Sequence, residues 1–215
     1  MHFLRRSIWI LTGFLVAVPF FLFAIVHWYE NKYDRLPVFG KLEINGNGAL
    51  LEHEVANFAF ENQDGKSFSS NELKNKIIVA NFFFTSCPSI CPNMMKHIKS
   101  IQDEYLKDQK VAFISFTVDP VRDDVKRLKW YSCKYNINNY DWNLLTGDKR
   151  EIYKLARKSY YLTADDGDGG ENDFIHSDQV VLVDAKKHIR GYYNGIDDIS
   201  TKLLKQDIKK LEHEN

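Results

Sequence analysis

Four stretches of the chain have the length and residue pattern of strands. Residues 77–84 and 111–116 are almost continuously apolar, which is typical of strands covered on both faces of a sheet. Residues 179–183 and 189–193 follow one another closely, so we expect them to pair antiparallel. Earlier in the chain, a Gln-Asp-Gly turn at residues 63–65 separates two short segments that contain phenylalanine. That turn predicts a β-hairpin before the first long strand.

Apolar positions at helical spacing fill the intervals between these strands. They predict helices that begin near Met94, Val121 and Ile152, and a last helix that begins near Ile199. The resulting order is a hairpin, a strand, a helix, a strand, two helices, a pair of strands and a terminal helix. This order predicts an α/β fold in which helices cover both faces of a central mixed β-sheet. Such a three-layer arrangement is thioredoxin-like, here with an N-terminal β-hairpin extension.

The N-terminal part of the chain carries the longest apolar run. Residues 7–29 contain no Asp, Glu, Lys or Arg, and about 20 apolar residues suffice to cross the hydrocarbon core of a bilayer. Two arginines precede the run, so the positive-inside bias keeps residues 1–6 in the cytoplasm. We therefore expect one transmembrane anchor at residues 7–29, a linker at residues 30–48 and an exported thioredoxin-like domain at residues 49–215.

A cleaved signal peptide is the alternative interpretation of the same run. The apolar core of a signal peptide is usually about 7–15 residues long and precedes a small-residue cleavage site. This run is longer, and no Ala-x-Ala pattern follows it. The six residues before it leave no room for an organellar transit sequence. The expected location is therefore the bacterial inner membrane, with the C-terminal domain in the periplasm.

The composition argues against two classes of protein for the exported part. The chain has 215 residues, and its 29 Lys and Arg balance its 29 Asp and Glu. A neutral balance argues against a broadly basic nucleic-acid-binding protein, because such proteins gain affinity by neutralising phosphates. Three cysteines are too few for a disulfide framework in a chain of this length. The spacing of the cysteines is therefore more informative than their number.

Cys87 and Cys91 lie just after the predicted strand at residues 77–84. In open α/β sheets, ligands bind beyond the carboxyl ends of the strands, so this position favours function. A helix start also favours thiolate over thiol. The spacing places both sulfurs on one face, one turn apart. They could form a disulfide, although so small a loop would add little stability, or hold copper(I), zinc or an iron–sulfur cluster.

Two sulfurs leave the coordination of a metal ion incomplete, so a third ligand is expected elsewhere in the chain. His176 is the best candidate, because it immediately precedes the predicted strand at residues 179–183. In a thioredoxin-like fold, the loop before that strand packs against the cysteine turn. The remaining histidines lie near the membrane run, beside the hairpin, between two strands or in the tail, and His97 is turned away from the cysteine face.

Four further residues have side chains that could act in a functional site, but their sequence context favours a structural role. Asp119 precedes a proline, which indicates an N-cap of the helix that follows. Cys133 has no partner at a useful spacing and is expected to pack beside the second helix. Met94 and Met95 could offer a thioether to copper, but their helical spacing predicts core positions.

Three motifs together resemble those of the Sco/SenC family. They are Cys-Pro-Ser-Ile-Cys-Pro at residues 87–92, Thr-Val-Asp-Pro-Val-Arg-Asp at residues 117–123, and His-Ser at residues 176–177. The resemblance extends over roughly residues 55–211. It implies a membrane-anchored, thioredoxin-like, copper-binding protein that helps to assemble the CuA centre of cytochrome c oxidase. By position, it implies that Cys87, Cys91 and His176 bind the copper ion.

The expected function is thus a copper metallochaperone that delivers one copper ion to the CuA site of cytochrome c oxidase subunit II. The alternative is an enzyme, a membrane-anchored thiol–disulfide reductase in which Cys87 and Cys91 act on the CuA-site cysteines. A further alternative is a peroxiredoxin-like peroxidase, which needs one cysteine and no histidine ligand. Other expected partners are a thiol–disulfide reductant or a copper donor, and no nucleic acid.

Overall fold

A computed structural model describes most of the chain. The described residues are 15–28, 35–41, 43–44, 50–106, 109–137, 141–162, 170, 175 and 177–214. They divide into two compact units, Met1–Arg35 and Leu36–Asn215. In the first unit, residues 15–28 of the predicted anchor form a helix with exposed side chains, and the rest of that anchor lies outside the described residues. No helix in the described ranges combines the length and the apolar character needed to cross a membrane.

The second unit is built on a mixed sheet, as predicted, and the sheet has seven strands. Its strand order is β4-β3-β7-β6-β5-β8-β9. The strands are β3 (Ala59–Asn62), β4 (Ser67–Ser69), β5 (Ile77–Phe83), β6 (Val111–Thr117), β7 (Trp142–Thr146), β8 (Gln179–Val183) and β9 (Ile189–Asn194). The three central strands β5, β6 and β7 run parallel, and every other neighbouring pair is antiparallel. The predicted hairpin, β3–β4, extends the sheet beyond β7.

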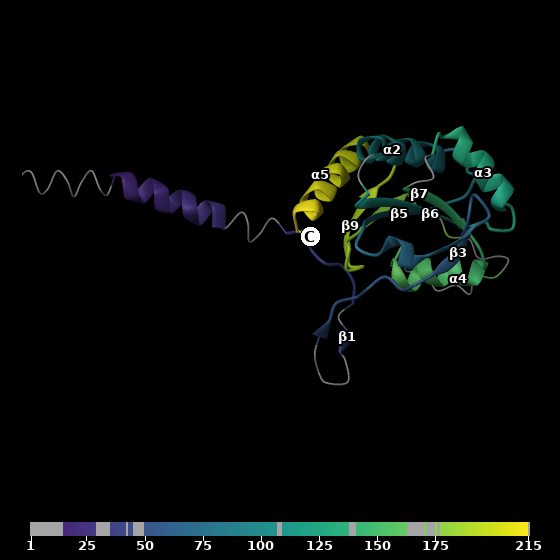
Figure 1. The fold of residues 1–215 in the computed structure, drawn as a ribbon, viewed down its shortest axis with the longest axis horizontal. Coiled ribbons are helices and arrows are strands. Elements are labelled where there is room, and N and C mark those ends of the chain that lie inside the picture. Colours follow the sequence, from purple (N-terminus) through teal and green to yellow (C-terminus); the bar gives the residue numbers. More distant parts are fainter. Residues whose placement is uncertain are drawn as a thin grey trace, which may run out of the picture. The chain divides into compact units, whose positions relative to one another are not determined.

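Helices cover both faces of this sheet. Their bounds are η1 (Ser70–Leu73), α2 (Ile90–Tyr105), α3 (Val125–Lys134), α4 (Lys149–Lys154), η2 (Leu155–Ser159) and α5 (Asp198–Glu214). Figure 1 shows α2, α3 and α5 on one side of the sheet and α4 on the other. The predicted three-layer α/β arrangement is therefore present.

The central strand β5 divides its side chains between two hydrophobic cores. Ile77, Val79 and Phe83 join the core under α2, α3 and α5. Ile78 and Phe82 join the core on the opposite face, with residues of α4 and η2. Successive side chains of a strand point to opposite faces, so a continuously apolar strand supplies both cores at once. The same strand carries the cysteine loop at its carboxyl end, which fixes that loop to a strand whose residues are all buried.

Strand β7 is absent from the sequence-based prediction, which passes directly from one helix to the next. All five of its residues, Trp142–Thr146, are buried. A short, continuously buried run has no alternation, and periodicity alone does not distinguish it from a buried helix. Parallel pairing with β6 over Phe113–Phe116 determines its conformation.

The start of α3 also corrects the prediction. The helix begins at Val125 and not near Val121, which is 86% exposed. Its N-cap is Asp124, whose side chain accepts the backbone N–H of Arg127 at 2.7 Å. Asp119 instead belongs to a turn in which its carbonyl accepts backbone N–H groups, so the prediction that Asp119 caps this helix is wrong.

Two short strands lie near the N-terminal end of the second unit. β1 (Glu43–Ile44) and β2 (Leu50–Leu51) pair antiparallel as a separate two-stranded sheet. β1 falls within the linker predicted at residues 30–48. The predicted linker therefore contains local β-structure.

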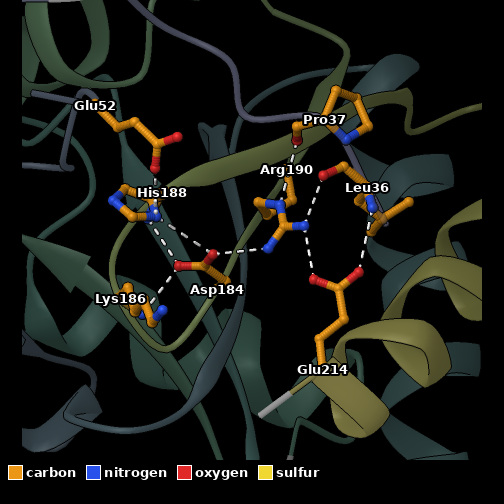
Figure 2. A network of polar contacts seen from close by, with 8 residues as sticks. All are labelled: Leu36, Pro37, Glu52, Asp184, Lys186, His188, Arg190 and Glu214. Carbon is orange, nitrogen blue, oxygen red and sulfur yellow. Dashed lines mark hydrogen bonds and ion pairs between the residues drawn. The ribbon is translucent and has the colours of Figure 1, made fainter. Parts of the chain in front are cut away.

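One buried guanidinium joins three separate segments of the second unit (Figure 2). Arg190 of β9 donates to Asp184 Oδ2 at 2.9 Å and to Glu214 Oε2 at 2.7 Å. It also donates to the carbonyl oxygens of Leu36 at 2.6 Å and Pro37 at 3.2 Å. Burial opposes the charge on Arg190, but the two carboxylates outweigh this effect and raise its pKa. The beginning of the unit, the end of β8 and the end of α5 are thus held together.

Candidate functional site

The two motif cysteines lie where β5 gives way to α2. Cys87 is partly exposed in the connecting loop, and Cys91 is 4% exposed in the first turn of the helix. The backbone N–H of Cys91 points to Cys87 Sγ, with 3.3 Å between nitrogen and sulfur. Both cysteines are free thiols. The structure thus brings the predicted pair together at the carboxyl end of a central strand.

The two thiols have different electrostatic environments. For Cys87, burial opposes ionisation, but the backbone N–H groups of Cys91, Ser89 and Ile90 and the Cys91 side chain outweigh it and lower the pKa. For Cys91, burial dominates and raises the pKa to about 12. The neighbouring Cys87 thiol adds to this increase, while the backbone of Phe84 opposes it. At neutral pH, Cys87 is therefore the better nucleophile and Cys91 keeps its proton.

A cavity of about 190 Å³ opens beside the pair. Cys87 and Cys91 form one side of it, and apolar side chains from the ends of β5 and β6 form another. Ile175, Ser177 and Asp178, from the segment that precedes β8, complete the lining. The predicted ligand His176 lies outside the described residues. The residues immediately before and after it, however, line the same cavity as both cysteines.

The methionines that follow the cysteine motif belong to the core, as predicted. Met94 and Met95 are completely buried. Met94 Sδ accepts the side-chain N–H of Asn81 at 3.8 Å, so its thioether is engaged on the β5 side of α2. A Cβ added at Gly195 would lie 2.7 Å from Met94 Cγ, which shows how tightly the helix packs there.

Cys133 and Asp119 stand apart from the cavity lining. Cys133 is exposed on α3, whose buried face carries Leu128, Tyr131 and Ser132, so the expectation that it packs beside this helix is wrong. The Asp119 carboxylate pairs with Arg122 at 3.2 Å. Neither residue lines the cavity that contains Cys87 and Cys91.

A buried carboxylate near the cysteine loop is the main feature that sequence reasoning missed. Asp123 is completely buried and bonds to Thr85, two residues before Cys87. The only sequence signal was its place in the motif at residues 117–123, which follows the strand adjacent to β5. Nothing in the sequence indicates which of the aspartates in and after that motif turns inward.

Comparison with known proteins shows which family the chain matches. The SCO1/SenC family model matches residues 48–212. The SCO1 protein homolog of Bacillus subtilis is 35% identical over 161 residues, which cover 74% of this chain and 83% of that protein.

Two solved structures share the fold. One is BsSco, a member of the Sco family of cytochrome c oxidase assembly proteins with an identified disulfide switch. It has a TM-score of 0.64 at 33% identity and covers 76% of this chain and 95% of its own. The other is copper-bound ScoI of Bradyrhizobium japonicum, with a TM-score of 0.59 at 26% identity. It covers 74% of this chain and 99% of its own. The chain therefore belongs to the SCO1/SenC family.

Proposed function

We propose that this protein is a copper metallochaperone, in which Cys87, Cys91 and His176 hold one copper ion for delivery to the CuA site of cytochrome c oxidase subunit II. The observation that carries the proposal is the cavity lined by both cysteines and by both chain neighbours of His176. Thiolate and imidazole are ligands that suit copper. The two cysteine sulfurs and the imidazole, which come from distant parts of the sequence, would converge at one point.

The chemistry of the donor set supports a site for copper as cargo. Cys87 has a lowered pKa and offers a thiolate readily, whereas Cys91 must lose its proton to bind. Metal binding therefore releases protons, and affinity weakens as the pH falls. Three ligands leave a position open through which an acceptor ligand can attach before the first ones leave. A closed four-ligand site would resist such a transfer.

The relatives support both the metal and the partner. Copper-bound ScoI shows that a protein of this fold holds copper, and BsSco belongs to a family of cytochrome c oxidase assembly proteins. For this chain, the proposal is that cytochrome c oxidase accepts the copper ion. The CuA site of subunit II is the acceptor implied by the family resemblance.

The membrane arrangement is also part of the proposal. Residues 7–29 would anchor the protein in the bacterial inner membrane, with residues 1–6 in the cytoplasm and the copper site in the periplasm. The absence of charged residues from this run and the two arginines before it support this orientation. A tethered domain would meet a membrane-bound oxidase on the same side of the membrane.

The second candidate function is thiol–disulfide reduction, and the unequal thiols favour it. The Cys87 thiolate would attack one sulfur of an acceptor disulfide, forming a mixed disulfide and releasing the other sulfur as a thiol. Cys91 would then lose its proton, attack Cys87 Sγ and release the second acceptor thiol. The acceptor gains two electrons, and Cys87 and Cys91 become a disulfide that an external dithiol must reduce.

Copper content and thiol exchange measured on the same variants separate the two functions. The purified reduced protein should hold one copper ion tightly, and Cys87→Ser and His176→Ala should hold it only weakly. His176→Ala should keep its thiol–disulfide exchange rate, and His213→Ala, at the end of α5, should behave like the wild type. Full-affinity copper binding by His176→Ala would refute the metal site. Catalytic reduction of an oxidised acceptor by the copper-free protein would favour the reductase.

A further inference from the structure

One carboxylate connects the two loops that follow the neighbouring strands β5 and β6. Asp123 is completely buried and accepts three hydrogen bonds. The Thr85 backbone N–H donates to it at 3.0 Å, and the Thr85 hydroxyl donates at 2.5 Å. The third donor is the Thr117 hydroxyl, at 2.5 Å. Thr85 belongs to the cysteine loop and Thr117 ends β6, so Asp123 ties the loop to the adjacent strand.

The direction of these hydrogen bonds is fixed by further donors. Arg127 Nε donates to Thr85 Oγ1 at 2.9 Å, and the Asp119 backbone N–H donates to Thr117 Oγ1 at 3.1 Å. Each hydroxyl thus accepts one bond and gives its own hydrogen to Asp123. Both hydroxyl groups of the network therefore donate and accept. Arg127 donates to Thr85, so only the Thr85 hydroxyl separates its positive charge from the Asp123 carboxylate. Fully satisfied buried networks of this kind fix a unique local geometry.

The network acts at the base of the loop that carries the nucleophilic thiol. Thr85 lies two residues before Cys87, and the Cys87 backbone N–H donates to the Phe84 carbonyl at 3.3 Å. The loop that begins at Thr85 is also joined to the start of α2, because Cys87 Sγ accepts the Cys91 backbone N–H at 3.3 Å. Anchoring Thr85 therefore limits where Cys87 Sγ can lie relative to the start of α2. Positions of metal ligands commonly depend on outer hydrogen bonds of this kind.

We propose that Asp123 is a positioning residue of the cysteine pair, which acts through Thr85 to hold Cys87 Sγ in the open, reduced geometry beside Cys91. The inference rests on the proposed use of this pair, whether for copper or for thiol exchange. Loss of the tether removes a constraint that favours the reduced loop. A disulfide, by contrast, holds the loop covalently and depends less on the tether. The equilibrium between dithiol and disulfide therefore shifts toward the disulfide.

A purely structural role for Asp123 is the competing explanation, and the fold contains a matched control for it. Asp184 is also buried and accepts backbone N–H groups from Lys186 and His188 as well as Arg190. It follows β8, whose last residue pairs with the beginning of β5, so it lies at the opposite end of the sheet from the cysteines. Asp184→Asn should lower stability without altering the cysteine pair.

The test is the dithiol–disulfide equilibrium of Cys87 and Cys91, measured in glutathione buffers by mass spectrometry after alkylation. Thr85→Val, which removes the hydroxyl, should favour the disulfide by about tenfold, equivalent to about 30 mV for this two-electron couple. Thr85→Ser keeps the hydroxyl and should stay near the wild type. Asp123→Asn should shift in the same direction as Thr85→Val, and Asp123→Glu should recover part of the shift if it folds.

The outcomes distinguish this inference from the proposed function. If Thr85→Val and Thr85→Ser share the wild-type equilibrium, or if Asp184→Asn shifts it equally, the positioning role is wrong. The measurement needs no copper, so a wild-type protein that fails to bind copper would refute the chaperone and leave this result standing. Thr85→Val remains informative even if Asp123→Asn does not fold, because it removes only one hydroxyl from the network.

Discussion

At the scale of single residues, the two thiols of one short motif are chemically different. The sequence predicts that both lie at a helix start, where thiolate is favoured. In the structure only Cys87 has that benefit, because it lies outside the helix with backbone N–H groups directed at its sulfur. Cys91 lies inside the first turn, where burial outweighs the same effect. The difference depends on the depth of each side chain, which spacing alone does not predict.

This difference predicts unequal alkylation of the reduced protein. At neutral pH, iodoacetamide should modify Cys87 first, because the thiolate is the reacting species and the pKa of Cys87 is lowered. Its rate should reach half of its alkaline maximum at a pH below 9.0, the ordinary pKa of the thiol. Cys91, with a pKa of about 12, should gain reactivity only in strong alkali. Peptide mass spectrometry across a pH series measures both rates, and equal rates at pH 7 would contradict the assignment.

At the scale of elements, regular strands were easier to predict than helix ends. The apolar runs at residues 77–84 and 111–116 correspond to β5 and β6 within one residue at each end. The prediction starts α3 too early because it takes Asp119, which precedes a proline, as the N-cap, although aspartates also stand at positions 123 and 124. Each could cap a helix, and tertiary contacts decide among them. Asp123 turns inward, Asp119 belongs to a turn, and Asp124 caps.

The capping assignment predicts different effects for two of these aspartates. Asp124→Ala removes the acceptor for the Arg127 N–H and should lower the free energy of unfolding by about 1 kcal/mol, as is usual for an N-cap. Asp119→Ala removes an ion pair with the exposed Arg122 and should lower the free energy of unfolding by a smaller amount. Urea denaturation of both variants measures the difference. A larger loss for Asp119→Ala would show that the helix is capped as the sequence suggested.

At the scale of the whole molecule, the sheet and its layers followed from the pattern, but the contacts that join distant segments did not. Arg190 lies in a predicted strand, yet its partners are spread from Leu36 to Glu214. The pairing of β8 with β9 brings Asp184 near Arg190, and α5, which packs against β9, brings Glu214 within reach of the same side chain. The same limit applies to Asp123, whose partner Thr85 is 38 residues away.

The Arg190 contacts predict a large loss of stability when the guanidinium is removed. Arg190→Met keeps most of the side-chain volume but removes the guanidinium that pairs with both Asp184 and Glu214 (Figure 2). Breaking a buried ion pair costs about 3–5 kcal/mol. Lys205→Met, which breaks the more exposed pair with Glu104, should cost less than about 1 kcal/mol. Equal urea midpoints for the two variants would show that the Arg190 contacts contribute no more than a surface pair.

The central claim is that two sulfurs and one imidazole bind a single copper ion. Copper K-edge X-ray absorption of the loaded protein tests it most directly, because it identifies the atoms around the metal. We expect two sulfur neighbours and one nitrogen neighbour in the wild type. In His176→Ala loaded with excess copper, the imidazole signal should be lost while the sulfur signal remains. An unchanged nitrogen contribution in that variant, or a site without two sulfurs in the wild type, would contradict the account.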